Sequence, residues 1–173
     1  MVEIKLLSKE GIPRALVMAK QYRLLNEPDE AESICLDILA ADPDHLEALV
    51  TLLLALTDKF SESGLNPAFS QAKEIVDKLG DSFCKSYYLG IIFERLGKYH
   101  LKQGGPGAGT VCHDWLAKAL ECFEEAMTSC DPDNQDTVLR WNSCARLINN
   151  NAEIKAGGPD QAEPLLDSFD TPH

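Results

Sequence analysis

Apolar residues recur along this chain with helical rather than alternating spacing, in blocks that aspartate, proline and asparagine separate. Pro28 suits the first turn of one predicted helix, the stretch ADPD at 41–44 ends it, and another helix starts near Leu46. Asn66 is the predicted N-cap of the next. The four apolar stripes in this half are Ala15, Met18, Ala19 and Tyr22; Ala31, Ile34, Cys35, Ile38 and Leu39; Leu49, Leu52, Leu53 and Leu56; and Ala68, Ala72, Ile75 and Val76. The pattern predicts an all-α chain.

The stripes also repeat along the chain. The offsets 0, 3, 4 and 7 join the first and third stripes with two later ones, which begin at Ser86 and Val138. Leu49 follows Ala15 by 34 residues, and Ser86 follows Leu49 by 37. A second pattern recurs in between, as Ala31-x3-Cys35, Ala68-x3-Ala72 and Ala119-x3-Phe123. Such a period is typical of helical hairpins that stack on one another.

With these residues the sequence resembles the tetratricopeptide repeat family, whose unit of about 34 residues reads W-x2-L-G-x2-Y, then A-x3-F, then P. The closest matches are YYLGIIFERLGKY at 87–99 and EAESICLDILAADPD at 30–44. The first-position Trp is missing from every full repeat, and Gly80 stands where the second repeat should have its Pro. The resemblance implies a right-handed α-solenoid of antiparallel helix pairs, with about three repeats and a terminal capping helix.

Within such hairpins, small residues let two helices approach while aromatic rings fill the gaps between hairpins. We expect Ala19, Gly90, Ala31 and Ala119 in the first role, and Tyr22 and Phe93 in the second.

The resemblance and the composition together predict three regions. They are an N-terminal extension at 1–11, a helical repeat domain at 12–151, and an acidic tail with Pro and Gly at 152–173 that we expect to be mobile. The domain comprises repeats at about 12–45, 46–82 and 83–133, a capping helix at 135–151, and a glycine-rich insertion at 103–113.

The predicted last helix either closes the array or begins a fourth unit that a partner or a second copy completes. In the first case Arg140, Asn149 and Asn150 form a polar outer face, with Trp141 and Ala145 turned inward. Two short apolar segments are candidate docking motifs: Leu165, Leu166 and Phe169 in the tail, and Ile4, Leu6 and Leu7 near the start.

Charge and composition narrow the function classes. The 173 residues are 45% hydrophobic, which is enough for one domain with a core, and the net charge of -12 disfavours nucleic acid and anionic membranes as partners. Neither a signal peptide nor a long apolar run is present, so we expect a soluble cytoplasmic protein with six reduced cysteines. There is no CxxC pair and the histidines are scattered, so neither a metal site nor a cofactor is expected.

The stretch KQGGPGAGTVCHDW at 102–115 looks most like chemistry. A phosphate loop needs a preceding strand and a Lys-Ser/Thr ending, and both are missing. Adjacent residues on a helix point in different directions, so Cys112, His113 and Asp114 cannot form a catalytic relay by themselves. Asp114 is interpreted as the N-cap or first-turn acid of the next helix, and Val111 and Trp115 as buried. An enzyme or small-ligand site that uses this insertion with Cys112 and His113 is the alternative interpretation.

The leading interpretation is a non-enzymatic interaction module. In the family that the sequence resembles, the concave face lined by first helices binds a peptide or helix of a partner. The positions carried over are Leu16, Lys20, Arg23 and Leu24; Glu47, Val50, Leu54, Thr57 and Asp58; Tyr87, Ile91, Glu94 and Arg95; and Leu139, Ser143 and Arg146. Of the family's basic clamp for chaperone tails only Lys20 is present, so that partner is not expected. Self-association is a third interpretation.

Overall fold

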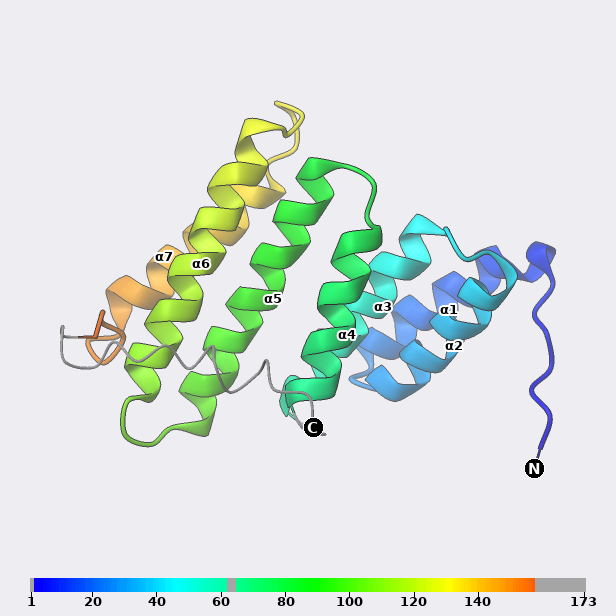
Figure 1. The fold of residues 1–173 in the computed structure, drawn as a ribbon, viewed down its shortest axis with the longest axis horizontal. Helices are drawn as coiled ribbons and strands as arrows, with labels where there is room; N and C mark the ends of the chain where they lie inside the picture. Colours follow the sequence, from blue (N-terminus) through cyan, green and yellow to red (C-terminus); the bar gives the residue numbers. More distant parts are fainter. Residues whose placement is uncertain (1, 62–64, 158–173) are drawn as a thin grey trace. The chain divides into compact units, whose positions relative to one another are not determined.

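The computed structural model describes residues 2–61 and 65–157, which form two compact units, Met1–Lys85 (unit 1) and Ser86–His173 (unit 2). Within these described residues there are seven α-helices, two short 3-10 turns and no strand (Figure 1). The prediction of an all-α chain is therefore confirmed for the described part.

Unit 1 is built from four consecutive helices that pack each on the next. They are α1 (Ile12–Leu24), α2 (Pro28–Ala41), α3 (Leu46–Asp58) and α4 (Leu65–Lys78), with 3-10 turns at Lys9–Gly11 and Lys59–Ser61. The starts of α2 and α3 are those that the sequence predicts. The side chain of His45, which the sequence pattern did not single out, caps α3 by accepting the Ala48 N–H at 3.2 Å. The predicted N-cap Asn66 lies inside the helix instead, because α4 begins at Leu65.

The core of unit 1 corrects the predicted orientation of α1. Ile12 and Leu16 are buried against Ile38 of α2 and Ala48 of α3, whereas Met18, a member of the predicted stripe, is exposed. The buried face of α1 is thus turned toward Leu16, because that rotation brings a large aliphatic side chain into contact with both neighbouring helices. The predicted small residues Ala19 and Ala31 are fully buried, as expected.

Unit 2 contains most of α5 (Ser82–Gln103), followed by α6 (Ala108–Thr128) and α7 (Asp136–Asn150). The glycine-rich insertion predicted at 103–113 is mostly helix, and only a short turn at 104–107 joins α5 to α6. Gly104, Gly105 and Gly107 have φ values of 70°, 94° and 79°, which residues with a side chain rarely adopt. Asp114 does not cap α6, since the helix begins two turns earlier than predicted.

The contact between α5 and α6 depends on small residues. A Cβ at Gly90 would lie 2.5 Å from the ring of Phe123, and one at Gly97 would lie 3.1 Å from the carbonyl oxygen of Cys112. Phe93 was expected to fill a gap between hairpins, but its ring packs on Trp115 of α6 in the same hairpin, with centroids 5.5 Å apart. The two helices therefore approach closely where the sequence places glycine.

The chain after α7 folds back on α6. Ile154 is buried, and the Glu153 carbonyl approaches Gly109 so closely that a side chain at 109 would collide with it. The tail predicted to be mobile from residue 152 is therefore anchored at Glu153 and Ile154, while the other residues of 152–157 are exposed. The predicted docking motif with Leu165 lies outside the described residues.

Candidate functional site

In unit 1 the predicted binding residues of α1 and α3 lie on one surface. Lys20 pairs with Glu47 at 2.7 Å, and Arg23 pairs with Asp58 through Nε and Oδ2 at 2.8 Å. The second pair is mostly shielded from solvent and the first is exposed, so Arg23 and Asp58 contribute more to holding the two helices together.

The centre of this surface is apolar. Val50 and Leu54 are half-buried and follow Glu47 at helical spacing along α3, toward Asp58. Leu16 is only 8% exposed and packs in the core, and Thr57 is only 3% exposed, so neither belongs to the surface that the resemblance implies. We call Lys20, Arg23, Glu47, Val50, Leu54 and Asp58 the α1/α3 face.

In unit 2 a buried carboxylate joins α5 to α7. Glu94 is 1% exposed; it accepts from Lys98 one turn later and from Arg140 of α7, whose Nη1 lies 3.4 Å from Oε2. The side chains of Lys98 and Arg140 keep about two fifths of their surface in solvent. One interior negative charge thus holds two cations at the surface. The prediction that Arg140 belongs to a polar outer face is wrong in this respect, because its guanidinium is paired with Glu94.

The other predicted residues of unit 2 separate by burial. Ile91 and Glu94 are 2% and 1% exposed and belong to the interior, which corrects their assignment to the binding surface. Tyr87 and Arg95 are half-buried, and Arg146 is exposed. The Tyr87 ring stands edge-on to Tyr88, with centroids 5.1 Å apart, and lies 6.1 Å from Phe123, so packing fixes its position.

The structure adds a hollow that sequence reasoning missed. It has a volume of about 260 Å³ and lies in unit 1 among α2, α3 and α4. Its lining residues are Glu32, Leu36, Leu52, Leu56, Gln71, Glu74, Ile75 and Lys78. In the sequence, the feature that points to this hollow is Leu36, an additional leucine in the apolar run of α2. In the structure its side chain is 53% exposed.

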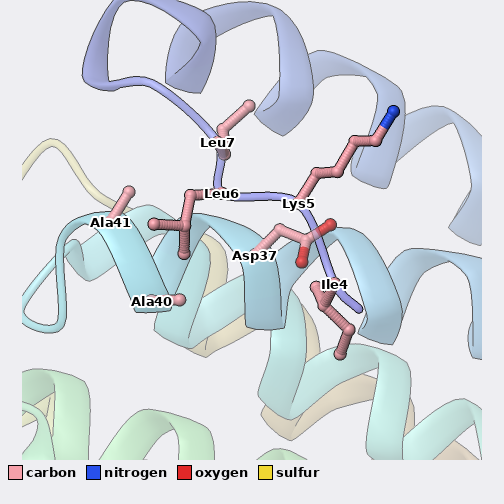
Figure 2. A pocket seen from close by; sticks show the side chains of 7 residues that line it. All are labelled: Ile4, Lys5, Leu6, Leu7, Asp37, Ala40 and Ala41. Atoms are coloured by element: carbon pink, nitrogen blue, oxygen red, sulfur yellow. The ribbon is translucent and has the colours of Figure 1, made fainter. Parts of the chain in front are cut away.

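A smaller hollow lies beneath the N-terminal segment. Residues 4–7 cross α2 in an extended conformation and enclose about 120 Å³ with Asp37, Ala40 and Ala41 (Figure 2). Leu7 packs on the core of unit 1, whereas Ile4 and Leu6 stay exposed. The segment is therefore anchored at one end and presents apolar side chains along the rest.

The Cys112, His113 and Asp114 run does not form a catalytic arrangement. Cys112 is fully buried, and burial raises the pKa of its thiol to about 11. His113 Nδ1 lies 3.5 Å from Asp114 Oδ1 at the surface, and no hydrogen bond joins Cys112 to either of them in the described part of the chain. Although these three residues are adjacent in the sequence, the Cys112 side chain lies in the interior and those of His113 and Asp114 reach the surface.

Cys112 should therefore react slowly with iodoacetamide at pH 8 in the native protein. With a pKa of about 11, only about one thiol in a thousand is ionised at this pH, and the buried sulfur is shielded as well. Peptide mapping by mass spectrometry after timed alkylation, with a sample unfolded in urea as the reference, measures the protection. Alkylation of native Cys112 at the rate of the unfolded chain would contradict this assignment and favour the alternative site.

Residues 2–61 and 65–157 contain no group of three or more His, Cys, Asp and Glu side chains that is able to hold a metal ion. No described helix is both long enough and apolar enough to cross a bilayer. No family model, no curated protein and no solved structure matches this chain.

Proposed function

We propose that this chain is a non-enzymatic protein-interaction module that binds a peptide or helical segment of a partner protein on the α1/α3 face. The observation that carries the proposal is the arrangement of this face: the half-exposed side chains of Val50 and Leu54 lie along a helix surface whose charged residues are already paired. Ion pairs formed before the partner arrives lower the ordering cost of binding, and an apolar strip suits the anchors of an amphipathic segment.

We further propose that the helix pairs continue the tetratricopeptide-like pattern, as a right-handed α-solenoid of about three repeats with α7 as the capping helix. One close approach and the burial of two alanines support this proposal. Gly90 meets Phe123 at the positions where the repeat has its small and bulky residues, and Ala31 and Ala119 are fully buried at the corresponding sites of the second helices. In such an array Tyr87, Arg95 and Arg146 would belong to a related surface of unit 2. A cytoplasmic location is part of the same proposal.

Changing Leu54 to Glu should weaken peptide binding by at least about tenfold, because a charge in the apolar strip removes a central anchor. The test selects binders from a displayed peptide library and measures each affinity for the wild type and the variant by fluorescence anisotropy. Helicity should stay unchanged, since Leu54 is only half-buried.

Leu36→Glu is the matched control, because Leu36 is the exposed leucine of α2 beside the separate hollow. Peptides that bind the Leu54→Glu variant as well as the wild type, or that lose affinity only for Leu36→Glu, would show that the α1/α3 face is not the binding surface. A library that yields no binder at all would contradict the proposed function itself.

A further inference from the structure

Residues 2–6 are all exposed, and every second one of them is apolar. Val2, Ile4 and Leu6 are 94%, 80% and 89% exposed. Figure 2 shows Ile4 and Leu6 on one side of the extended backbone and Lys5 and Leu7 on the other. This alternation is that of a β-strand. Leu7 is held by the core of unit 1, so the segment is a short extended stretch fixed at one end, with apolar side chains that remain exposed.

The backbone of this segment also has no partner. Within the described residues, the N–H and C=O groups of residues 2–7 make no backbone hydrogen bond. Glu3 and Lys5 are exposed and form no ion pair with the described chain. An unpaired extended backbone with apolar side chains is a template for pairing with another strand.

The sequence of the segment identifies that strand, because VEIKL is complementary to itself when reversed. In an antiparallel pair centred on Ile4, the two Ile4 side chains face each other and Val2 faces Leu6 of the second copy. Glu3 then faces Lys5 of the second copy, which makes two opposite-charge pairs. Side chains that lie directly opposite share one side of the ribbon, so all apolar side chains gather on one side and both ion pairs on the other.

We propose that two copies of this chain associate through residues 2–6 as a two-fold antiparallel strand pair centred on Ile4. The exposed backbone edge of this segment thus pairs with the same segment of a second copy. The apolar side of the resulting ribbon can then cover the hollow lined by Ala40 and Ala41. This association is independent of the α1/α3 face. A two-stranded ribbon is marginal by itself, so the dissociation constant of the dimer is about 1 µM or higher.

Sedimentation equilibrium of the full chain from about 1 µM to 1 mM tests the association. The wild type should move from monomer to dimer as the concentration rises. Glu3→Lys places lysine opposite lysine twice and should raise Kd by about tenfold or more, whereas Glu3→Lys/Lys5→Glu restores opposite charges and should return Kd to the wild-type range. Glu10→Lys, the same change just after the segment, is the control. A wild type that stays monomeric would overturn the proposal, and this is also the result expected if the segment pairs with a strand of another protein. A dimer that Glu3→Lys leaves unaffected would overturn it as well.

Engineered cysteines test the register. Ile4→Cys should form an interchain disulfide under mild oxidation, because the two positions face each other. Leu6→Cys should not, since the two copies of residue 6 lie about 14 Å apart in this register, but it should cross-link to Val2→Cys in a mixture of the two variants. The wild type, with its six free cysteines, gives the background. Equal cross-linking of Ile4→Cys and Leu6→Cys chains, or none for any variant, would refute the pairing.

Discussion

Replacing Gly90 with valine is expected to lower the free energy of unfolding by about 3 kcal/mol, the largest effect of any single substitution considered for this chain. A Cβ at this position would lie 2.5 Å from Cε1 and 2.7 Å from Cδ1 of Phe123. The Phe123 ring is fully buried and cannot swing into solvent, so α5 and α6 would have to separate. Urea unfolding followed by circular dichroism measures the loss.

Gly80→Val is the matched control, because no atom lies within 4 Å of a Cβ at Gly80, and it should change stability little. A rescue variant tests the cause. If the ring is the obstacle, Gly90→Ala/Phe123→Leu should lose less stability than the sum of its two single changes, since the smaller side chain makes room. Additive losses, or a Gly90→Val protein as stable as the wild type, would mean that the close approach of α5 and α6 does not limit this position.

Removing both cations around Glu94 is expected to cost about 3 kcal/mol, because Lys98→Met/Arg140→Met leaves a carboxylate that is 1% exposed without a compensating charge. Adding Glu94→Gln to this double variant should recover part of the loss, since the interior charge is then gone. The same urea unfolding experiment measures all three proteins.

The control for this experiment repeats the chemistry at exposed positions of the same two helices. Lys102→Met/Arg146→Met changes one lysine of α5 and one arginine of α7, both in solvent, and should shift stability by less than about 1 kcal/mol. Equal losses in the two double variants would indicate a general effect of reduced charge rather than an interaction with Glu94.

Local patterns in the sequence predicted the helices of unit 1 well. Pro28 and Leu46 mark the starts of α2 and α3 because proline at a first turn, and an apolar stripe after a polar stretch, act within a few residues of chain. The stripes of α3 and α4 are buried as expected for the same reason. The glycine-rich stretch shows the limit of such patterns. Glycine favours a loop locally, yet α6 starts at Ala108, and α5 approaches it so closely at Gly97 that a Cβ there would lie 3.1 Å from the Cys112 carbonyl oxygen; such packing between helices can override local propensity.

The candidate site was predictable only in part. Lys20, Arg23, Val50 and Leu54 were assigned to one surface by family positions, and they do lie on adjacent helices. Leu16 and Ile91 were assigned in the same way but are buried, because a small rotation of a helix about its axis exchanges interior and surface positions. The pairing of Glu94 with Arg140 joins residues 46 positions apart and has no local signal.

The sequence by itself determined the helical class of this chain, the places where α2 and α3 begin, and the small residues at which helices approach. These properties follow from backbone preference and from the spacing of apolar side chains, which act over one or two turns. Only the tertiary structure decided which side of each helix is buried, which charges meet, and that residues 2–6 are exposed and make no backbone hydrogen bond with the described chain. Those outcomes depend on neighbours distant in the chain, whose packing selects one rotation of each helix among several that the same periodicity allows.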